Sequence, residues 1–156
     1  VPSRRCRDVL GNGDPRGTRE RRVQPLPRYA QVVLVGDFLY PIPEIAVRLR
    51  AIADMGVKGA VLRIIDPAEE DFPYKGRTRF LGLEGENPLL APRAESLASD
   101  WRALFAAHQQ ELAEVCRRLG WRYIKHRTDR PPQTALLALY HAMQGERGLT
   151  AGAAAR

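Results

Sequence analysis

The chain has 156 residues, 44% of them hydrophobic and 28% charged, which suits a single domain of ordinary size with a buried apolar core. No apolar run approaches the roughly 18 residues that a membrane-spanning helix needs. The two cysteines stand in no metal-binding or redox spacing, so we expect a reducing, cytoplasmic location.

The formal net charge of +7 is unevenly distributed along the chain. Residues 1–31 hold 8 Arg against 3 acidic residues, whereas residues 32–156 hold 17 Lys and Arg against 15 acidic residues. We therefore expect residues 1–27 to be a basic arm that is disordered or non-native, and residues 145–156 to be a disordered tail. Only Tyr29 interrupts the basic segment with an aromatic ring, so nucleic-acid binding is an unfavoured interpretation.

The first strand is expected to begin at Gln31, where an apolar run is typical of a strand buried on both faces in the middle of a parallel sheet. The run leads directly to Asp37. In open α/β sheets, ligands bind beyond the carboxyl ends of the strands, so Asp37 is a candidate site residue. The alternative is that Asp37 only forms a turn or caps the next helix.

A helix and a second strand are expected next. Pro43 favours a helix start, apolar residues then recur at helical spacing, and Gly56 is the expected left-handed stop. Residues 57–65 are expected to form a strand that completes a right-handed parallel crossover. This strand ends at Asp66, the first of four acidic residues within residues 66–71. These acids either add to the site or form an ordinary solvated loop.

The second half of the chain predicts a hairpin and a long helix. Residues 77–91 are expected to form a small β-hairpin insertion. From about residue 93 to 119, apolar residues recur every three or four positions, which predicts the longest helix of the chain. His108 lies on this apolar stripe and is expected to pack there, since no second His or Cys lies one turn away to share a metal.

A third strand over residues 121–126 and a closing helix over 136–143 complete the predicted order of elements. The order predicts a three-layer, Rossmann-like α/β domain with a mainly parallel sheet. Three parallel strands are few, and the first residues contain neither an initiator Met nor a signal-peptide core, so we expect the domain to be incomplete at its N-terminal side. Asp37, Asp66 and Asp129 follow the three strand ends and would lie along one edge of the sheet.

Several motifs together resemble a known family. They are Val33-Leu34-Val35-Gly36-Asp37-Phe38-Leu39, Asp66-Pro67-Ala68-Glu69-Glu70-Asp71-Phe72-Pro73-Tyr74, Gly82-Leu83-Glu84, Arg93-Ala94-Glu95-Ser96 and His126-Arg127-Thr128-Asp129-Arg130-Pro131-Pro132. In content and spacing they resemble the bacterial family known as domain of unknown function 58, over residues 28–143. Residues 1–27 show no such resemblance.

The resemblance implies a von Willebrand factor A-like domain in residues 28–144 that acts beside MoxR-type AAA+ ATPases as an adaptor. Such domains bind a divalent cation through an Asp-x-Ser-x-Ser motif, a Thr and a later Asp, and Asp37 falls on that later Asp. No Asp-x-Ser-x-Ser motif occurs in this chain. The implied Mg²⁺ or Mn²⁺ site is therefore complete only with upstream sequence, because one carboxylate does not hold Mg²⁺ tightly.

Two functions stay open at this point. The first is the non-enzymatic protein-interaction module that the resemblance implies. The second is a metal-dependent phosphoesterase or nuclease, in which Asp37, Asp66 and Asp129 converge on a pair of metal ions. Each of these acids has an ordinary turn role beside Pro or Gly, and no Lys or His is placed as an acid or base, so the hydrolase ranks second.

Overall fold

The computed structural model describes residues 27, 30–81 and 87–144. Most of the expected basic arm, the centre of the expected hairpin and the expected tail lie outside these residues. None of the described helices is long and apolar enough to cross a membrane. The elements are β1 (Gln31–Gly36), α1 (Ile42–Ala53), β2 (Lys58–Ile65), α2 (Pro67–Asp71), β3 (Thr78–Phe80), β4 (Leu89–Ala91), the 3₁₀ helix η1 (Ala94–Leu97), α3 (Ala98–Arg118), β5 (Arg122–Arg127) and α4 (Pro132–Gln144).

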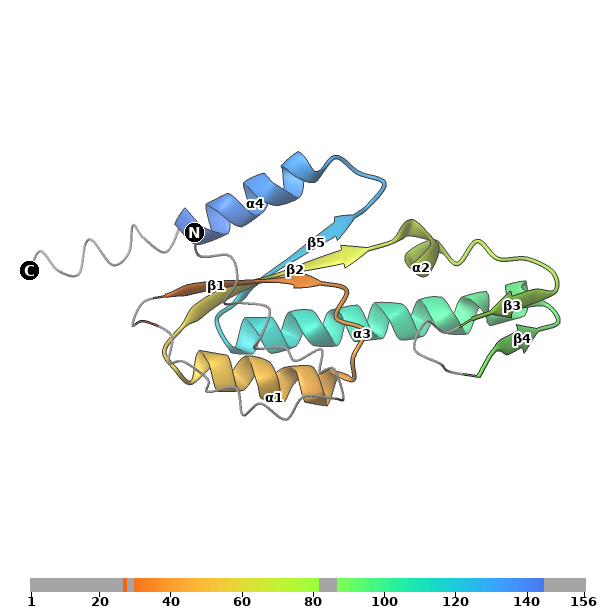
Figure 1. Cartoon of the computed structure of the whole chain (residues 1–156), viewed down its shortest axis with the longest axis horizontal. Helices are drawn as coiled ribbons and strands as arrows, with labels where there is room; N and C mark the ends of the chain where they lie inside the picture. The colour runs from red at the N-terminus through yellow and green to blue at the C-terminus, as the bar shows by residue number, and fades with distance from the viewer. Residues whose placement is uncertain (1–26, 28–29, 82–86, 145–156) are drawn as a thin grey trace, which may run out of the picture.

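A three-stranded parallel sheet forms the centre of the molecule, in the order β1-β2-β5. Helices α1 and α3 lie on one face of this sheet and α4 lies on the other (Figure 1). The mixed α/β class, the parallel sheet and the order of the main elements are thus confirmed. The central strand is β2, whose Val61 and Ile65 are fully buried.

The position of β1 differs from the expectation. The apolar run predicts a strand in the middle of the sheet, but β1 lies at the edge of the sheet that the described strands form. Val32 and Leu34 are buried toward α1 and α3, whereas Val35 is 56% exposed. The reason is that α4 packs mainly against β5 and β2 and meets β1 near Gln31, so the opposite face of β1 is left uncovered at Val35.

The main core lies between the sheet and the pair α1 and α3. Its buried members are Val32, Leu34, Phe38, Ile45, Leu49, Ile52, Val57, Val61, Leu112, Cys116 and Trp121. Cys116 is fully buried, as expected of a small core residue. Trp121 lies so close to Gly59 that a Cβ atom at residue 59 would overlap the indole ring. Only glycine fits at this point of the central strand.

A smaller unit extends away from the sheet beside the N-terminal half of α3 (Figure 1). We call the described residues 74–81 and 87–97 the projection. Strands β3 and β4 pair antiparallel in it, which confirms the expected hairpin. Ala91 and Ala94 of the projection form a second small core with Phe72 at the end of α2. At this turn of α3 Phe105 packs on the sheet, and the neighbouring Leu104 is therefore 70% exposed.

Candidate functional site

The three candidate aspartates lie beyond the carboxyl ends of the parallel strands. Asp37 directly follows β1, Asp66 directly follows β2, and Asp129 comes shortly after β5. Because the strands are parallel, these ends share one edge of the sheet. We call this the carboxyl edge. The side chains of the three aspartates, however, have different partners.

Asp37 and Asp66 both bind backbone N–H groups nearby in the sequence. The Oδ1 atom of Asp37 lies 3.4 Å from the nitrogen of Leu39, and Oδ1 of Asp66 accepts a hydrogen bond of 2.7 Å from the nitrogen of Ala68. These are the turn and cap partners that the alternative interpretation expects. The assignment of Asp37 as a metal ligand stays a prediction.

The acidic segment after β2 is a short helix rather than the solvated loop considered above. Asp66 caps its first turn and Pro67 occupies a position where a helix needs no N–H donor. Glu69 and Glu70 lie in the first turn, where the helix dipole favours negative charge. Phe72 ends the helix in the left-handed region, with a φ of 46°. Helix α2 therefore presents its acids in fixed directions along the carboxyl edge.

Asp129 is paired with Arg127, which binds three carboxylates. Its Nη2 atom lies 3.0 Å from Asp129 Oδ2 and 3.0 Å from Asp71 Oδ2, and its Nη1 atom lies 2.8 Å from Glu70 Oε2. Lys125 Nζ binds the other oxygen of Glu70 at 2.9 Å. We call these five side chains the Arg127 network. It joins α2 to β5, and it binds the carboxylates at this end of the carboxyl edge.

The Arg127 network keeps its carboxylates ionised. Hydrogen bonds from Lys125, and then from Arg127, hold the pKa of Glu70 below its ordinary value. The hydrogen bonds from Arg127 likewise lower the pKa of Asp71 and of Asp129. Such acids are poor proton acceptors near neutral pH, which argues against a general base among them.

Glu69 lies in a different electrostatic environment. Burial raises its pKa, a backbone hydrogen bond at Asp66 opposes the rise, and the negative charges of Asp66 and Asp37 add to it. The structure therefore brings Asp37 and Asp66 into electrostatic reach of a third carboxylate, which the sequence analysis did not single out. Asp129 is instead hydrogen-bonded to Arg127.

The described residues include no group of three or more His, Cys, Asp or Glu side chains placed to hold a metal ion. By themselves they do not form the two-metal centre that the hydrolase requires. The implied Mg²⁺ or Mn²⁺ site at Asp37 stays a prediction that the described residues do not test. His108, as expected, is a half-buried packing residue, and its Nε2 atom lies 3.0 Å from the carbonyl oxygen of Tyr40.

Arg63 is a notable residue that sequence reasoning passed over. It lies on the central strand β2 and is only 1% exposed. Its guanidinium carbon lies 4.8 Å from the ring centroid of Phe105 on α3. None of its three nitrogen atoms has a hydrogen-bond partner. The available signal was a charged residue within the apolar run from Val61 to Ile65, which a central strand buries.

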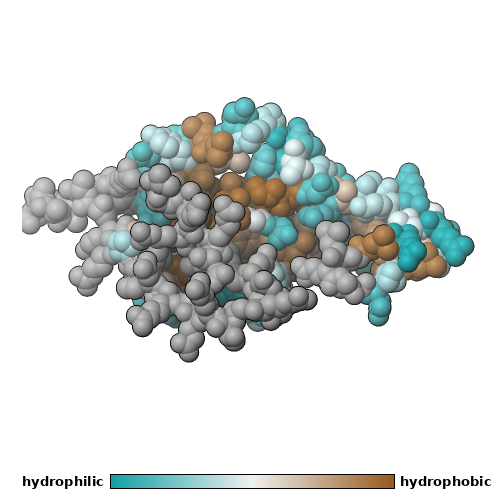
Figure 2. Space-filling view, viewed as in Figure 1, coloured by the Kyte–Doolittle hydropathy of each residue, from teal (hydrophilic) through white to brown (hydrophobic). Residues whose placement is uncertain are grey.

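The projection combines exposed leucines with three cations that form no ion pair among the described residues. Leu81, Leu89 and Leu90 are 67%, 58% and 49% exposed. Figure 2 shows hydrophobic residues among hydrophilic ones at this end of the molecule. Among the described residues, the exposed cations nearby in the sequence form no ion pair; they are Lys75, Arg77 and Arg79. The sequence analysis predicted the hairpin but not this surface.

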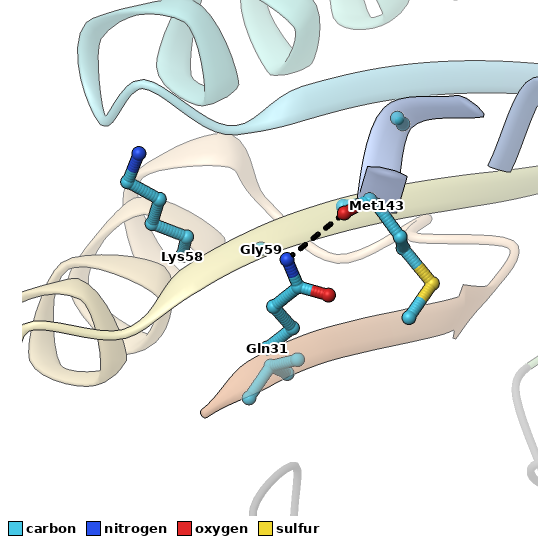
Figure 3. Close-up of a pocket in the computed structure, with 7 residues that line it drawn as sticks. Gln31, Lys58, Gly59 and Met143 are labelled. Carbon is cyan, nitrogen blue, oxygen red and sulfur yellow. Dashed lines mark hydrogen bonds between the residues drawn. The ribbon is translucent and has the colours of Figure 1, made fainter. Parts of the chain in front are cut away.

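A small depression lies at the opposite end of the sheet, between β1, β2 and the end of α4 (Figure 3). Gln31 Nε2 donates a hydrogen bond of 3.1 Å across it to the carbonyl oxygen of Met143. Its volume of about 10 Å³ has room for roughly one water molecule. It is too small for an organic ligand, so the carboxyl edge and the projection are the candidate functional surfaces.

Comparison of the chain with protein-family models, with curated protein sequences and with solved structures finds no match. The class of protein is therefore defined by its own geometry. It is a mixed α/β domain with a three-stranded parallel sheet and a projecting antiparallel pair of strands.

Proposed function

We propose that this chain is a non-enzymatic protein-interaction module that contacts its partner through the projection. The observation that carries the proposal is the surface on which Leu81, Leu89 and Leu90 are exposed, close in sequence to cations that have no ion-pair partner among the described residues. Apolar surface gathered at one place and rimmed by polar groups is typical of protein-interaction sites. The surrounding charges would select a partner of complementary charge.

The chemistry of the carboxyl edge supports the same function. Glu70, Asp71 and Asp129 are bound by the cations of β5, at distances of 2.8 to 3.2 Å. Acids that are held in this way stabilise the fold and have little freedom to bind a metal ion or move a proton. The hydrolase therefore gains no support from the described residues.

The proposal extends to the family that the sequence resembles. A parallel sheet with helices on both faces is the layout expected of a Rossmann-like, von Willebrand factor A-like domain, and it supports that assignment. We propose a partner of the MoxR-type AAA+ ATPase class and a cytoplasmic location. In a longer chain, Asp37 would supply one ligand to Mg²⁺ or Mn²⁺.

The proposal is tested by measuring binding of a purified MoxR-type ATPase to the immobilised chain. The test variant is Leu89→Asp, and the control is Leu136→Asp on α4, because both leucines are 58% exposed in the wild type. We expect binding to the wild type and to the control, and a loss of at least tenfold in affinity for Leu89→Asp. Circular dichroism verifies that both variants fold.

Two results would contradict the proposal. One is the absence of any binding of the ATPase to the wild type. The other is an equal loss of affinity in Leu89→Asp and Leu136→Asp, which would place the contact outside the projection.

A further inference from the structure

Arg63 stands out because its charge is buried without compensation. The guanidinium carries several N–H donors and does not lose its proton in proteins. Its three nitrogen atoms are inaccessible and have no hydrogen-bond partner. The ring of Phe105 compensates only part of this cost, since a ring under the face of the cation leaves the N–H groups at its edge unpaired. Buried charges of this kind are normally paired.

A second unpaired donor lies beside Arg63. Tyr123 on β5 is in register with Val61, and Lys125 is in register with Arg63, so these side chains share the α3 face of the sheet. The Tyr123 hydroxyl is buried and has no partner. Burial raises the pKa of Tyr123, whereas the charge of Arg63 and a hydrogen-bonding contact with it oppose the rise. This contact falls outside ordinary hydrogen-bond geometry, so the Arg63 nitrogens and the Tyr123 hydroxyl stay without a well-formed partner.

The neighbouring cations show what Arg63 lacks. Lys125 and Arg127 lie on the same face of β5, and each is bound to Glu70. Arg63 is within electrostatic reach of Glu69 but is not bonded to it. On its other side Arg63 is in register with Gly36, beside which the ring of Phe38 lies. Of these three cations, only the most deeply buried has no carboxylate.

We propose that Arg63 and Tyr123 form a binding site for a carboxylate group. The planar fork of a guanidinium matches the two oxygens of a carboxylate, and the Tyr123 hydroxyl adds a further donor. Phe105 forms the floor of the site. The site lies in the carboxyl half of the central strand, on the side of the sheet edge where open α/β folds bind ligands.

The surrounding charges favour a monoanionic carboxylate over a phosphate dianion. Asp66 and Asp37 place negative charge near this part of the edge, since the charge of each raises the pKa of Glu69. A second charge on the ligand would be repelled by these groups. In addition, two donor groups satisfy the oxygens of a carboxylate more fully than the three oxygens of a phosphate.

Access to Arg63 requires a movement, and α2 is the element suited to it. This helix has no buried residue. Polar contacts hold it beside α3: Trp101 Nε1 donates to the carbonyl oxygen of Glu69 at 2.6 Å, and Arg102 Nη2 donates to that of Asp71 at 2.7 Å. Opening of α2 breaks these contacts and the bonds of Glu70 and Asp71 to Lys125 and Arg127, but it exposes little apolar surface. Opening of α2 moves Glu69 away from Arg63.

The test is thermal unfolding of the full chain in acetate and in chloride, at matched pH and ionic strength. We expect acetate to raise the Tm of the wild type by about 2–4 °C at saturation. Arg63→Met should not respond to acetate, and in chloride it should melt above the wild type because an unpaired buried charge has been removed. Arg122→Met, which changes an exposed residue of β5, should respond like the wild type.

Three results would overturn the proposal. They are an unchanged wild-type Tm in acetate, an equal response of Arg63→Met, and a larger response to phosphate than to acetate. If Arg63→Met does not fold, the Nε–H signal of Arg63 in the NMR spectrum of the wild type takes its place. That signal should shift saturably with acetate, and a signal that does not move would equally overturn the site.

Discussion

At the carboxyl edge of the sheet, Lys125 and Arg127 each lie within 3.0 Å of a carboxylate, whereas Lys75, Arg77 and Arg79 of the projection form no ion pair with any described residue. Apolar side chains divide in the same way. The sheet buries Val32, Leu34 and Val61 against α1 and α3, while the projection leaves leucines at its surface. The difference indicates that the charges of the edge hold the fold together, whereas Lys75, Arg77 and Arg79 have no such role toward the described residues.

A substitution at Gly59, in the central strand of the sheet, should cause the largest loss of stability. A Cβ atom there would overlap the ring of Trp121, so Gly59→Ala must displace the indole from a packed core. We expect a loss of about 1–3 kcal/mol or more in the free energy of unfolding, measured with urea. In the matched control Gly36→Ala, the new methyl group makes only ordinary contact with Phe38, at 3.8 Å, and the loss should stay below about 1 kcal/mol. Equal stability of the two variants would contradict the packing.

Arg127→Met should cause the next largest loss of stability. It removes the cation that joins α2 to β5 and leaves three carboxylates close together, so the urea midpoint should fall. Because the pKa values of Glu70, Asp71 and Asp129 are lowered in the folded state, their stabilisation is present above the ordinary carboxyl pKa of about 4. It is lost as the pH falls through the lowered values.

Urea unfolding between pH 7 and pH 2 measures this linkage. The stability of the wild type should decline more steeply on acidification than that of Arg127→Met. Arg122→Met serves as the control, since it removes an exposed Arg from the same strand, and it should retain the wild-type slope. If the stability of Arg127→Met and that of the wild type declined equally on acidification, the Arg127 network would not control acid stability.

Glu69→Gln should cause a small gain in stability. The pKa of Glu69 is raised in the folded state, mainly by burial, so its ionised form destabilises the fold above that pKa. Glutamine resembles the protonated acid, so the urea midpoint should rise slightly at pH 7. The gain should vanish near pH 3, where the wild-type carboxyl is itself protonated. A loss of stability at pH 7 would instead show that the charge of Glu69 supports Arg63.

Substitution of the exposed leucines should change the stability least. Leu89→Ser alters a side chain that already lies largely in water, so the free energy of unfolding should change by less than about 0.5 kcal/mol. Ala94→Leu, which inserts a large side chain into the core of the projection, should cost about 1–3 kcal/mol. A large loss in Leu89→Ser would mean that the leucine supports the fold rather than a partner.

Local signals in the sequence predict the element order well. Gly56 and Gly120 end their helices with φ values of 74° and 69°, as the left-handed stop requires. The cap and Pro that begin α2 were also present, at Asp66 and Pro67, but the density of acids before Pro73 favoured a loop. Capping signals outweigh charge density here because the cap binds the helix directly.

Contacts between distant segments set the features that the sequence did not predict. The edge position of β1 depends on where α4 packs, and an apolar run does not specify that. Arg63 is buried because Phe105, far along the chain, covers it. The sequence placed Asp129 beyond a strand end correctly, but its pairing depends on Arg127 and on the path of α2. The periodicity of apolar residues indicates which face of a helix or strand is buried. It does not indicate which other element packs against that face.

Each of the chain's two tryptophans lies in a different environment. Trp121 is only 4% exposed within the main core, whereas Trp101 is 40% exposed where α3 leaves the sheet and packs on Phe72. The intrinsic fluorescence of the unlabelled chain therefore contains one component that dissolved quenchers reach and one that is shielded from them. A partner covering the projection would alter the emission of Trp101, and loosening of the sheet would shift that of Trp121 to longer wavelength. Docking and unfolding are thus optically separable in the same sample.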